Sequence, residues 1–381
     1  EWFSLTLSPS TMAEEFGKEL DKLDDESSRT SKRIARAPPS PDDIVEEQLK
    51  EGDFLITMQS TFLLHVEYRR EVASSMFDVM RRSDGWVMRI EFEKDDDENR
   101  GPKRIDLEGA VQRILYQQRD PSLVNHLHLC VDMGSHAPWN YAMFPQYLLT
   151  IPEFLQEADQ IDKDRGTFLK VAIHSFIGLR HLHSTEIVHG AIRPENILIG
   201  MERSCRKILI GNFSSASSNQ RELPKPNDVK DSIYSSRARQ RNFEPTKKDD
   251  LESWTYCVAE MFNKKLLPWH PDQKFIGATA HKESLALKRA FCHGKMWTAQ
   301  REMIFEEFKV ILQLLSKIRA TGELPYELIF SLLSTAAKHT ELSVFAASPW
   351  SKSNRGALVT PSKFETAPEP VEYEDFVSNL P

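Results

Sequence analysis

The spacing of apolar residues changes near residue 152, and this change limits the possible fold more than any other feature of the chain. Before it, apolar residues fall in short alternating runs, as in residues 76–80 and 86–92, which is typical of β-strands. After it, helical spacing recurs over residues 168–183, 251–263, 283–292, 302–320 and 326–338. A strand-rich part followed by a helix-rich part predicts an α+β fold with a small β-rich lobe and a larger α-helical lobe.

The strand-rich part predicts a small sheet with one helix beside it. Residues 76–80 and 86–92 are expected to pair as neighbouring strands that turn at Ser83-Asp84-Gly85, because Asp and Gly favour tight turns. Residues 105–117 carry apolar side chains at helical spacing. Further strands are expected over residues 54–68, 127–133 and 141–144.

Both ends of the chain differ in composition from the middle. Residues 1–53 are rich in Asp, Glu, Lys and Ser with few aromatic residues, which predicts a disordered, acidic N-terminal tail. Residues 342–381 are Ser/Pro-rich and acidic, and we expect a second tail there. The segment between them, 54–341, has the size of one domain, with a first lobe over 54–147 and a second over 148–341.

Charge and apolar runs exclude several classes of protein. The net charge of −8 over 381 residues argues against a dedicated nucleic-acid binder. No apolar run approaches the length of a membrane span. The first residues lack the basic start and apolar core of a signal peptide. We therefore expect a cytoplasmic or nuclear protein that has neither nucleic acid nor membrane as a partner.

The cysteines and histidines do not indicate a metal site. Cys130, Cys205, Cys257 and Cys292 are far apart and form no Cys-x-x-Cys pair, so we expect reduced, buried thiols. The histidines do not fall at the spacing of zinc ligands. We expect no bound metal from these residues.

One short stretch carries the most specific chemistry. Residues 187–198 read Ile-Val-His-Gly-Ala-Ile-Arg-Pro-Glu-Asn-Ile-Leu. This resembles the catalytic loop of protein kinases, in which an aspartate accepts the proton of the substrate hydroxyl. Ala191 stands at the aspartate position, and a methyl group accepts no proton. Arg193 stands at the position of the loop lysine. Asn196 stands at that of the second metal ligand, with a capping or turn role as the alternative.

Four segments in the second half of the chain share a further pattern. They are Lys248-Asp249-Asp250-Leu-Glu-Ser253, Leu267-Pro268-Trp269, Tyr234-Ser-Ser, and Leu324-Pro-Tyr-Glu-Leu-Ile. They resemble the helix start, the later Leu-Pro-Trp, the Tyr-Ala-Ser and the last-helix entry of the casein kinase 1 superfamily, and in particular of its tau-tubulin kinases. The resemblance covers about residues 55–340 and implies a bilobal protein-kinase-like fold.

Carried over position by position, this resemblance implies degenerate nucleotide and metal sites. Arg89 falls at the strand lysine and can still pair with Glu108, which matches the partner glutamate on the first helix. Asn212, in Asn212-Phe213-Ser214, falls at the metal-binding aspartate and offers a neutral carbonyl where Mg²⁺ prefers a carboxylate. Phe144 falls at the back wall of the adenine pocket, with a core aromatic as the alternative.

The phosphate-binding loop is also missing, whereas two scaffold positions are kept. No glycine occurs from Asp53 to Asp84, although glycines let backbone N–H groups approach phosphates closely. The resemblance therefore implies absent or very weak binding of ATP and Mg²⁺. His189 matches the histidine that packs under the Asp-Phe-Gly segment, and Asp250 matches the aspartate that braces the catalytic loop.

A retained framework with altered catalytic positions favours a pseudokinase that acts as a protein-binding scaffold or allosteric partner. One alternative is a sensor that binds a nucleotide or another anion without turnover. The other is a weak, atypical Ser/Thr kinase that recruits a different base, for which Glu195 is the nearest carboxylate.

Basic residues gather around the segment that would be the activation segment of a kinase. They are Arg237, Arg239, Arg241, Lys247 and Lys248. One interpretation is a solvated charged face. The other is a docking site for an acidic or phosphorylated peptide of a partner protein, or for the acidic tail of the chain itself.

Overall fold

The computed structural model describes parts of the chain from residue 54 to residue 340. The chain divides into two units, Glu1–Lys50 and Glu51–Pro381, and every described residue lies in the second. Both expected tails and the expected turn at Ser83-Asp84-Gly85 lie outside the described residues. The described residues are 54–55, 64–65, 68–73, 76–81, 86–92, 104–118, 123–130, 132–136, 139–156, 165–200, 208–223, 232–270, 280–293, 304–320 and 322–340.

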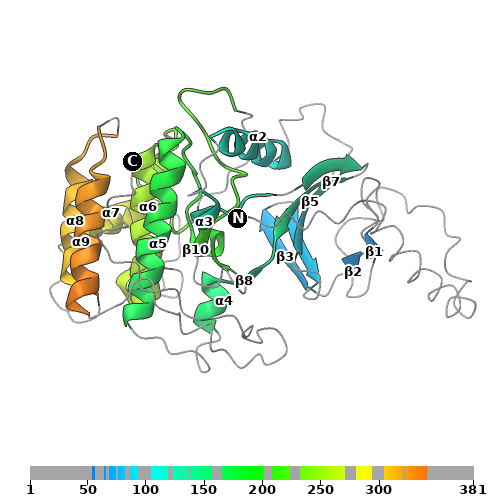
Figure 1. The fold of residues 1–381 in the computed structure, drawn as a ribbon. Helices are drawn as coiled ribbons and strands as arrows, with labels where there is room; N and C mark the ends of the chain where they lie inside the picture. The colour runs from blue at the N-terminus through cyan, green and yellow to red at the C-terminus, as the bar shows by residue number, and fades with distance from the viewer. Residues whose placement is uncertain are drawn as a thin grey trace, which may run out of the picture. The chain divides into compact units, whose positions relative to one another are not determined.

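The first lobe is built on a five-stranded antiparallel sheet in the order β3-β4-β5-β7-β6 (Figure 1). Its strands are β3 (Tyr68–Ala73), β4 (Met76–Arg81), β5 (Trp86–Phe92), β6 (Asp132–His136) and β7 (Trp139–Pro145). The predicted pairing of β4 with β5 is confirmed, with Phe77 opposite Ile90. The predicted helix is α2 (Arg104–Gln117), which packs against β5 and β7. Two short strands, β1 (Phe54–Leu55) and β2 (Leu64–His65), pair separately.

The strand expected over residues 127–133 is wrong in its first half. Helix α3 (Leu123–His126) ends just before it, and β6 begins only at Asp132. Leu127 instead forms a parallel bridge with Ile210, and the His128 N–H donates to the Ile210 carbonyl over 2.8 Å. The His128 N–H therefore bonds to the second lobe, whereas the His128 carbonyl and the Cys130 N–H bond to the Gln112 side chain on α2 and not to the sheet of the first lobe.

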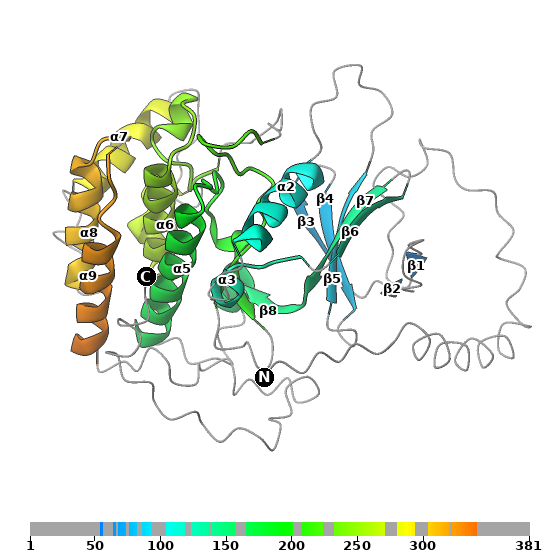
Figure 2. The same ribbon diagram turned by 45° about the horizontal axis from the view of Figure 1, so that its top comes forward.

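The second lobe combines a small sheet with packed helices (Figure 2). Its antiparallel sheet has the order β10-β9-β8, formed by β8 (Tyr147–Thr150), β9 (Ile197–Gly200) and β10 (Ile208–Ile210). Helix α5 lies against α6, α9 and β10, and α8 packs on α9. The helices are α4 (Ile151–Gln156), α5 (Arg165–Ser184), α6 (Lys247–Phe262), α7 (Ala280–Cys292), α8 (Glu306–Lys317) and α9 (Tyr326–His339).

The helix expected over residues 302–320 is shorter in the structure. Helix α8 begins at Glu306, because Phe305 has an extended backbone (φ −68°, ψ 146°). Ile304 and Phe305 are both buried, and the Phe305 ring lies 5.7 Å from that of Phe262. Packing of these two side chains onto the end of α6 takes precedence over one more helical turn.

The start of α6 fixes the position of the residues that contact the catalytic loop. Thr246 and Asp249 form a capping box, in which the Asp249 carboxylate accepts the Thr246 N–H over 2.9 Å. This arrangement satisfies backbone donors that a helix N-terminus otherwise leaves unpaired. It sets Asp250 in the first turn of the helix.

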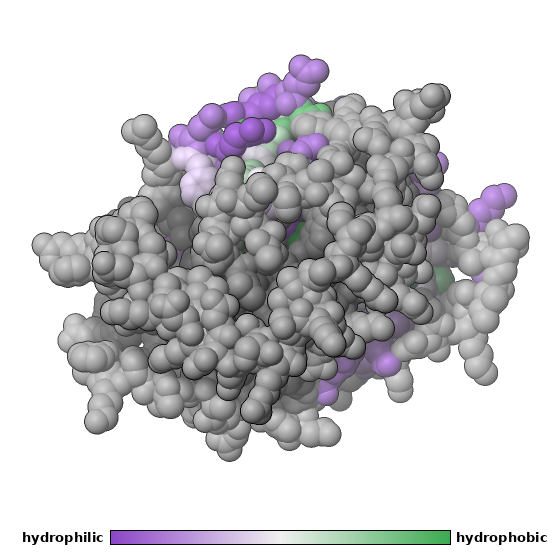
Figure 3. Space-filling view, turned by 90° about the vertical axis from the view of Figure 1, so that its right-hand side faces the viewer, coloured by the Kyte–Doolittle hydropathy of each residue, from purple (hydrophilic) through white to green (hydrophobic). Residues whose placement is uncertain are grey.

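Apolar side chains fill the interior of both lobes. Cys130, Cys257 and Cys292 are buried free thiols, as predicted, and Cys205 lies outside the described residues. On the face shown in Figure 3, the described side chains that reach the surface are mainly hydrophilic. Among the helices that the structure describes, none has the length and apolar character needed to cross a bilayer.

Candidate functional site

Asp250 holds the loop that resembles a catalytic loop through its backbone. Its Oδ2 accepts the His189 N–H over 2.6 Å, and its Oδ1 accepts the Gly190 N–H over 2.9 Å. His183 Nε2 lies 2.9 Å from the same Oδ2. The bracing contact predicted for Asp250 is therefore present, and it fixes residues 189–190 against the start of α6.

His189 lies under the segment that follows β10, as predicted. Its Nε2 lies 3.0 Å from the Gly211 carbonyl oxygen, and its ring centroid lies 5.6 Å from that of Phe213. Its Nδ1 accepts the Ala191 N–H over 3.3 Å. Burial lowers the pKa of this imidazole below its ordinary value, although the Asp250 charge opposes the shift. The neutral ring fits both contacts, with Nε2–H as donor and Nδ1 as acceptor.

Gly190 adopts a backbone conformation that favours glycine. Its φ is +74°, in the left-handed region. A Cβ at this position would also lie 2.4 Å from the Ser215 carbonyl oxygen. The position that carries arginine in the kinase motif therefore has no room for a side chain in this backbone arrangement.

The residues at the metal positions bond to one another. Ser214 Oγ donates to Asn212 Oδ1 over 2.6 Å, and Asn212 Nδ2 donates to Asn196 Oδ1 over 3.1 Å. Asn196 Nδ2 then donates to the Ala191 carbonyl over 2.8 Å. We call this chain of contacts the amide relay. It uses one carbonyl oxygen of each asparagine as an acceptor inside the protein, and sequence reasoning did not foresee it.

The backbone at both asparagines supports this arrangement. Asn212 has φ 65°, a left-handed conformation in which asparagine is several-fold enriched among residues other than glycine. Asn196 ends the 3₁₀ turn Pro194–Asn196, and its carbonyl accepts the Gly211 N–H over 3.0 Å. Asn196 thus has the turn role that the sequence left open, and it joins the loop to the end of β10.

Arg89 and Glu108 form the ion pair expected from the sequence. Arg89 Nη1 lies 3.1 Å from Glu108 Oε2, and their side chains are 1% and 0% exposed. Gln112 Nε2 donates to the other oxygen of Glu108 over 3.2 Å. The Arg89 guanidinium also lies 4.9 Å from the centre of the Phe144 ring. Its charge is therefore taken up within the first lobe.

Phe144 packs as a buried aromatic at the end of β7. Its ring stacks on that of His128 at 4.8 Å, and His128 Nε2 lies 2.7 Å from the Pro145 carbonyl oxygen. Phe144 belongs to an apolar cluster that joins the sheets of the two lobes beside the connection from β7 to β8. The cluster comprises Val87, Ile105, Cys130, Ala142, Phe144, Tyr147, Leu198 and Leu209.

The five basic residues expected to form a docking cluster differ in their surroundings. Lys247 Nζ lies 2.7 Å from Glu186 Oε2, and Lys248 Nζ donates to the Ile318 carbonyl. Arg241 Nε donates to the Arg237 carbonyl over 3.0 Å, and its guanidinium lies 5.6 Å from the centre of the exposed Phe243 ring. Arg239 makes no side-chain hydrogen bond or ion pair within the part of the chain that the structure describes.

Arg237 has a structural role in the domain, and its expected role in docking stays a prediction. Its Nε and Nη2 contact the two oxygens of Glu252 at 3.0 and 2.9 Å. Burial alone would raise the pKa of the Glu252 carboxyl, yet the hydrogen bonds and charge of Arg237 lower it. Two parallel bonds to a buried carboxylate fix the position of the Arg237 side chain against α6.

Further contacts hold the segment before α6 in place. The buried Lys288 on α7 donates to the Ser235 carbonyl over 2.7 Å and to Gln240 Oε1 over 3.1 Å. Trp269 Nε1 donates to the Ile233 carbonyl over 2.9 Å. These contacts could not be predicted from the sequence, because the partners lie tens of residues apart.

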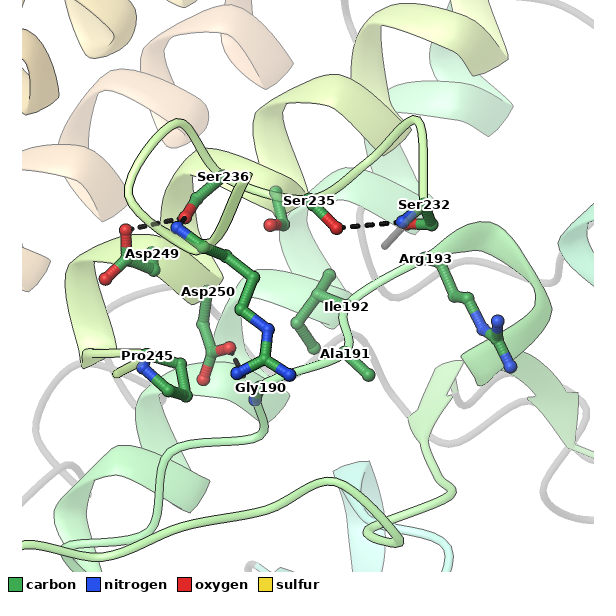
Figure 4. Close-up of a pocket in the computed structure, with 12 residues that line it drawn as sticks. Gly190, Ala191, Ile192, Arg193, Ser232, Ser235, Ser236, Pro245, Asp249 and Asp250 are labelled. Atoms are coloured by element: carbon green, nitrogen blue, oxygen red, sulfur yellow. Dashed lines mark hydrogen bonds between the residues drawn. The ribbon is translucent and has the colours of Figure 1, made fainter. Parts of the chain in front are cut away.

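A pocket lies between this segment and the loop at Ala191 (Figure 4). Gly190 to Arg193 line it from the loop side, and Ser232, Ser235 and Ser236 line it from the other. The Arg193 side chain is 32% exposed, and its Nε lies 3.9 Å from Glu195 Oε2. Among the described residues, no group of His, Cys, Asp and Glu side chains has the arrangement of a metal site.

Comparison with known proteins supports a kinase-like domain. No family model matches the chain. It is 22% identical over 276 residues to "Putative serine/threonine-protein kinase ZK507.1" of Caenorhabditis elegans, covering 70% of this chain and 77% of that protein. It is 23% identical over 204 residues to "Putative serine/threonine-protein kinase ZK507.3" of the same organism, covering 52% of this chain and 49% of that protein.

A third relative matches a shorter segment. The chain is 31% identical over 124 residues to the membrane-associated tyrosine- and threonine-specific cdc2-inhibitory kinase wee-1.3 of Caenorhabditis elegans, which is 28% of this chain and 17% of that protein. The chain thus spans about half of ZK507.3 and a smaller part of wee-1.3. None of the three names points to a casein kinase 1 or tau-tubulin kinase. Together with the bilobal arrangement of sheets and helices, these relatives identify the described part of the chain as a protein-kinase-like domain.

Proposed function

We propose that this protein is a catalytically inactive pseudokinase of the casein kinase 1 type that acts as a protein-binding scaffold or allosteric partner. The amide relay from Ser214 through Asn212 and Asn196 to Ala191 is the observation that carries this proposal. It joins the base position to both metal positions by internal hydrogen bonds. A kinase needs oxygens at these positions for a proton and for Mg²⁺.

The base position supports the proposal by its chemistry. The Ala191 methyl group accepts no proton, and loss of general base catalysis typically lowers a rate by about 10² to 10⁴. Glu195, the nearest alternative base in the sequence, lies 3.9 Å from Arg193 with 47% of its side chain exposed.

The metal positions support the proposal independently. Mg²⁺ prefers carboxylate and water oxygens in near-ideal octahedral geometry. Asn212 and Asn196 are neutral, and the Oδ1 atom of each already accepts a hydrogen bond from a neighbouring side chain. A cation there would lie beside two buried amides that supply no compensating negative charge.

The nucleotide side supports it as well. The Arg89 guanidinium is buried against Glu108 and Phe144, and its charge is paired with a carboxylate of the protein. Val87 from β5 and Leu198 from β9 lie in one buried cluster. Apolar side chains of the two lobes therefore pack together beside the connection from β7 to β8, where a kinase binds its nucleotide.

Two assays test the proposal. In the first, purified protein is incubated with radiolabelled ATP, Mg²⁺ and generic acidic and basic substrates, and we expect no phosphate transfer above a mock preparation. Transfer that Glu195→Gln abolishes would contradict the proposal and favour an atypical kinase. If Glu195→Gln leaves phosphate transfer unchanged, the preparation is separated by size-exclusion chromatography and each fraction is assayed. Transfer activity that co-elutes with the protein would also contradict the proposal.

The second assay measures nucleotide binding by thermal unfolding with ATP, in the presence and absence of Mg²⁺. A ligand at a hundredfold excess over its Kd stabilises the folded state by about 2.7 kcal/mol, so a millimolar titration also detects weak binding. We expect no Mg²⁺-dependent rise in Tm. A rise that requires Mg²⁺, with no phosphate transfer, would favour a nucleotide sensor.

A further inference from the structure

The pocket beside Ala191 has the features of an anion site. Ala191 contributes a methyl group where a kinase carries a carboxylate, so the usual negative charge is absent. Arg193 lines the pocket from the loop, and Arg239 lines it from the segment before α6. Two guanidinium side chains from separate segments therefore reach one pocket (Figure 4 shows the Arg193 side).

Several hydrogen-bond donors in this lining have no acceptor. The Arg239 guanidinium makes no hydrogen bond or ion pair to any described residue. Ser235 Oγ accepts the Ser232 N–H over 2.9 Å and Ser232 Oγ accepts the Tyr234 N–H over 3.2 Å, but neither hydroxyl donates within the described part.

Ser253 is an independent sign of a missing ligand. It lies in the first half of α6, lines the pocket and is only 7% exposed. Its hydroxyl has no hydrogen-bond partner among the described residues. A serine hydroxyl can donate a hydrogen bond, so this one is available to an acceptor that enters the pocket.

Two carboxylates also line the pocket, and both are committed to the protein. Asp250 accepts the His189 and Gly190 N–H groups and lies 2.9 Å from His183 Nε2. Asp249 accepts hydrogen bonds from Ser236 Oγ over 2.7 Å and from Thr246. These donors and the positive end of the α6 dipole offset both negative charges, which leaves the Arg239 guanidinium to attract an anion.

The pocket wall is already in place without a ligand. Arg237 is bound to Glu252 through two hydrogen bonds, and Lys288 holds the Ser235 carbonyl. Ser236 is fixed by Asp249. An anion therefore meets donors whose positions are set in advance, which lowers the entropy cost of binding.

We propose that this pocket binds the phosphate group of a phosphorylated serine or threonine side chain on a partner protein. The proposal rests on the proposed function, because an active kinase would place an unmodified hydroxyl beside a carboxylate here. A phosphomonoester carries a charge of about −1.5 to −2 and three acceptor oxygens. These match a planar guanidinium and hydroxyls that come from different elements better than the two oxygens of a carboxylate do.

The test titrates the protein against a fluorescent, alanine-rich peptide with one phosphoserine, read by anisotropy. Parallel titrations use the same peptide with serine and with glutamate, and inorganic phosphate serves as a competitor. We expect the phosphoserine peptide to bind most tightly. Arg239→Gln should weaken it by about tenfold or more, because a charge-assisted hydrogen bond is lost.

Arg241→Gln is the matched control, since it makes the same charge change in the same turn outside the pocket lining. It should alter the affinity by less than about twofold, as expected for a screened surface charge. Ala191→Asp restores a carboxylate to the pocket and should weaken phosphopeptide binding as Arg239→Gln does.

Several outcomes would overturn this inference. Equal binding of the serine peptide removes the role of phosphate, and equal binding of the glutamate peptide replaces it with a general acidic contact. An equal loss in Arg241→Gln means that the face is only diffusely charged. Inorganic phosphate that binds as tightly as the peptide means a site for the free ion. The phosphate-transfer assay on the same preparation separates the two proposals. If the protein transfers no phosphate and does not bind the phosphoserine peptide, only this inference is rejected. If it transfers phosphate, the proposed function is rejected.

Discussion

Asn212 Nδ2 donates a hydrogen bond to Asn196 Oδ1 over 3.1 Å, so the side chains at the two metal positions of the kinase pattern hold each other. Both side chains are buried. The contact depends on the amide nitrogen of Asn212, which an aspartate lacks. A change back to the usual kinase residue therefore removes a contact of the present fold.

We predict that Asn212→Asp lowers the free energy of unfolding by about 1–3 kcal/mol in the absence of divalent cations. The Asn196 acceptor would lose its donor and face a buried carboxylate. Urea unfolding in EDTA measures the change. Asn242→Asp is the control, because Asn242 is exposed and also left-handed, with φ 61°. An Asn212→Asp variant as stable as the control variant would show that the relay contributes nothing.

The Arg89–Glu108 pair gives a second prediction. Arg89→Met should lower the free energy of unfolding by about 3–5 kcal/mol, because it leaves the Glu108 carboxylate buried without its ionic partner. The double change Arg89→Met with Glu108→Leu should recover much of this loss, since no charge then stays buried. Chemical denaturation of the two variants measures both values.

Arg193→Met supplies the control for this prediction. Arg193 Nε lies 3.9 Å from Glu195 Oε2, and the two side chains are 32% and 47% exposed. Loss of this exposed pair should lower the free energy of unfolding by less than about 1 kcal/mol. A double variant that is less stable than Arg89→Met alone would mean that the pair is needed for more than charge balance.

Arg237 and Arg239 should behave differently although only Ala238 separates them in the chain. Arg237→Gln should lower the free energy of unfolding by about 3–5 kcal/mol, because Glu252 is buried and loses two hydrogen bonds. Arg239→Gln should change it by less than about 0.5 kcal/mol. Thermal unfolding of both variants checks this contrast, and similar Tm values for the two would refute it.

His189 should make the stability of the fold depend on pH. Its folded-state pKa is lowered by burial, so the unfolded chain binds a proton at higher pH than the folded one. The contribution of neutral His189 to the free energy of unfolding is complete above about pH 6.5, the ordinary pKa of histidine. It is lost as the pH falls through the folded-state pKa. His189→Gln should therefore flatten the dependence of unfolding free energy on pH below about 6.5.

The control for the histidine prediction is His293→Gln, because His293 is exposed at the end of α7. This variant should keep the slope of the parent protein. A slope that His189→Gln leaves unchanged would assign the acid sensitivity to other groups.

Much of the fold could be predicted from local patterns. The alternation in residues 76–80 and 86–92 requires each strand to present one face to a core, and β4 and β5 do pair. The positions of His189, Asp250, Arg89 and Glu108 followed from the resemblance, and their contacts are present. These predictions succeeded because the residues act through their own backbone position or through one fixed partner.

The rest could not be predicted, because it depends on side chains that meet only in three dimensions. A count of charges between residues 237 and 248 cannot show that Glu252 arrives from α6 to bind Arg237. Lys288 reaches the Ser235 carbonyl across 53 residues of sequence. The apolar residues of segment 127–130 predict a strand, yet its backbone bonds to β10 in the other lobe and to the Gln112 side chain on α2.

The contact from Lys288 to the Ser235 carbonyl has a consequence for control of the proposed binding surface. The ammonium group is buried and comes from α7, outside the segment that it holds. Lys288, Trp269 and the ion pair of Arg237 with Glu252 hold this segment, and none of these contacts involves a phosphate group. The surface is therefore assembled as soon as the domain folds. Timing of an interaction then falls to the enzymes that add and remove phosphate on the partner.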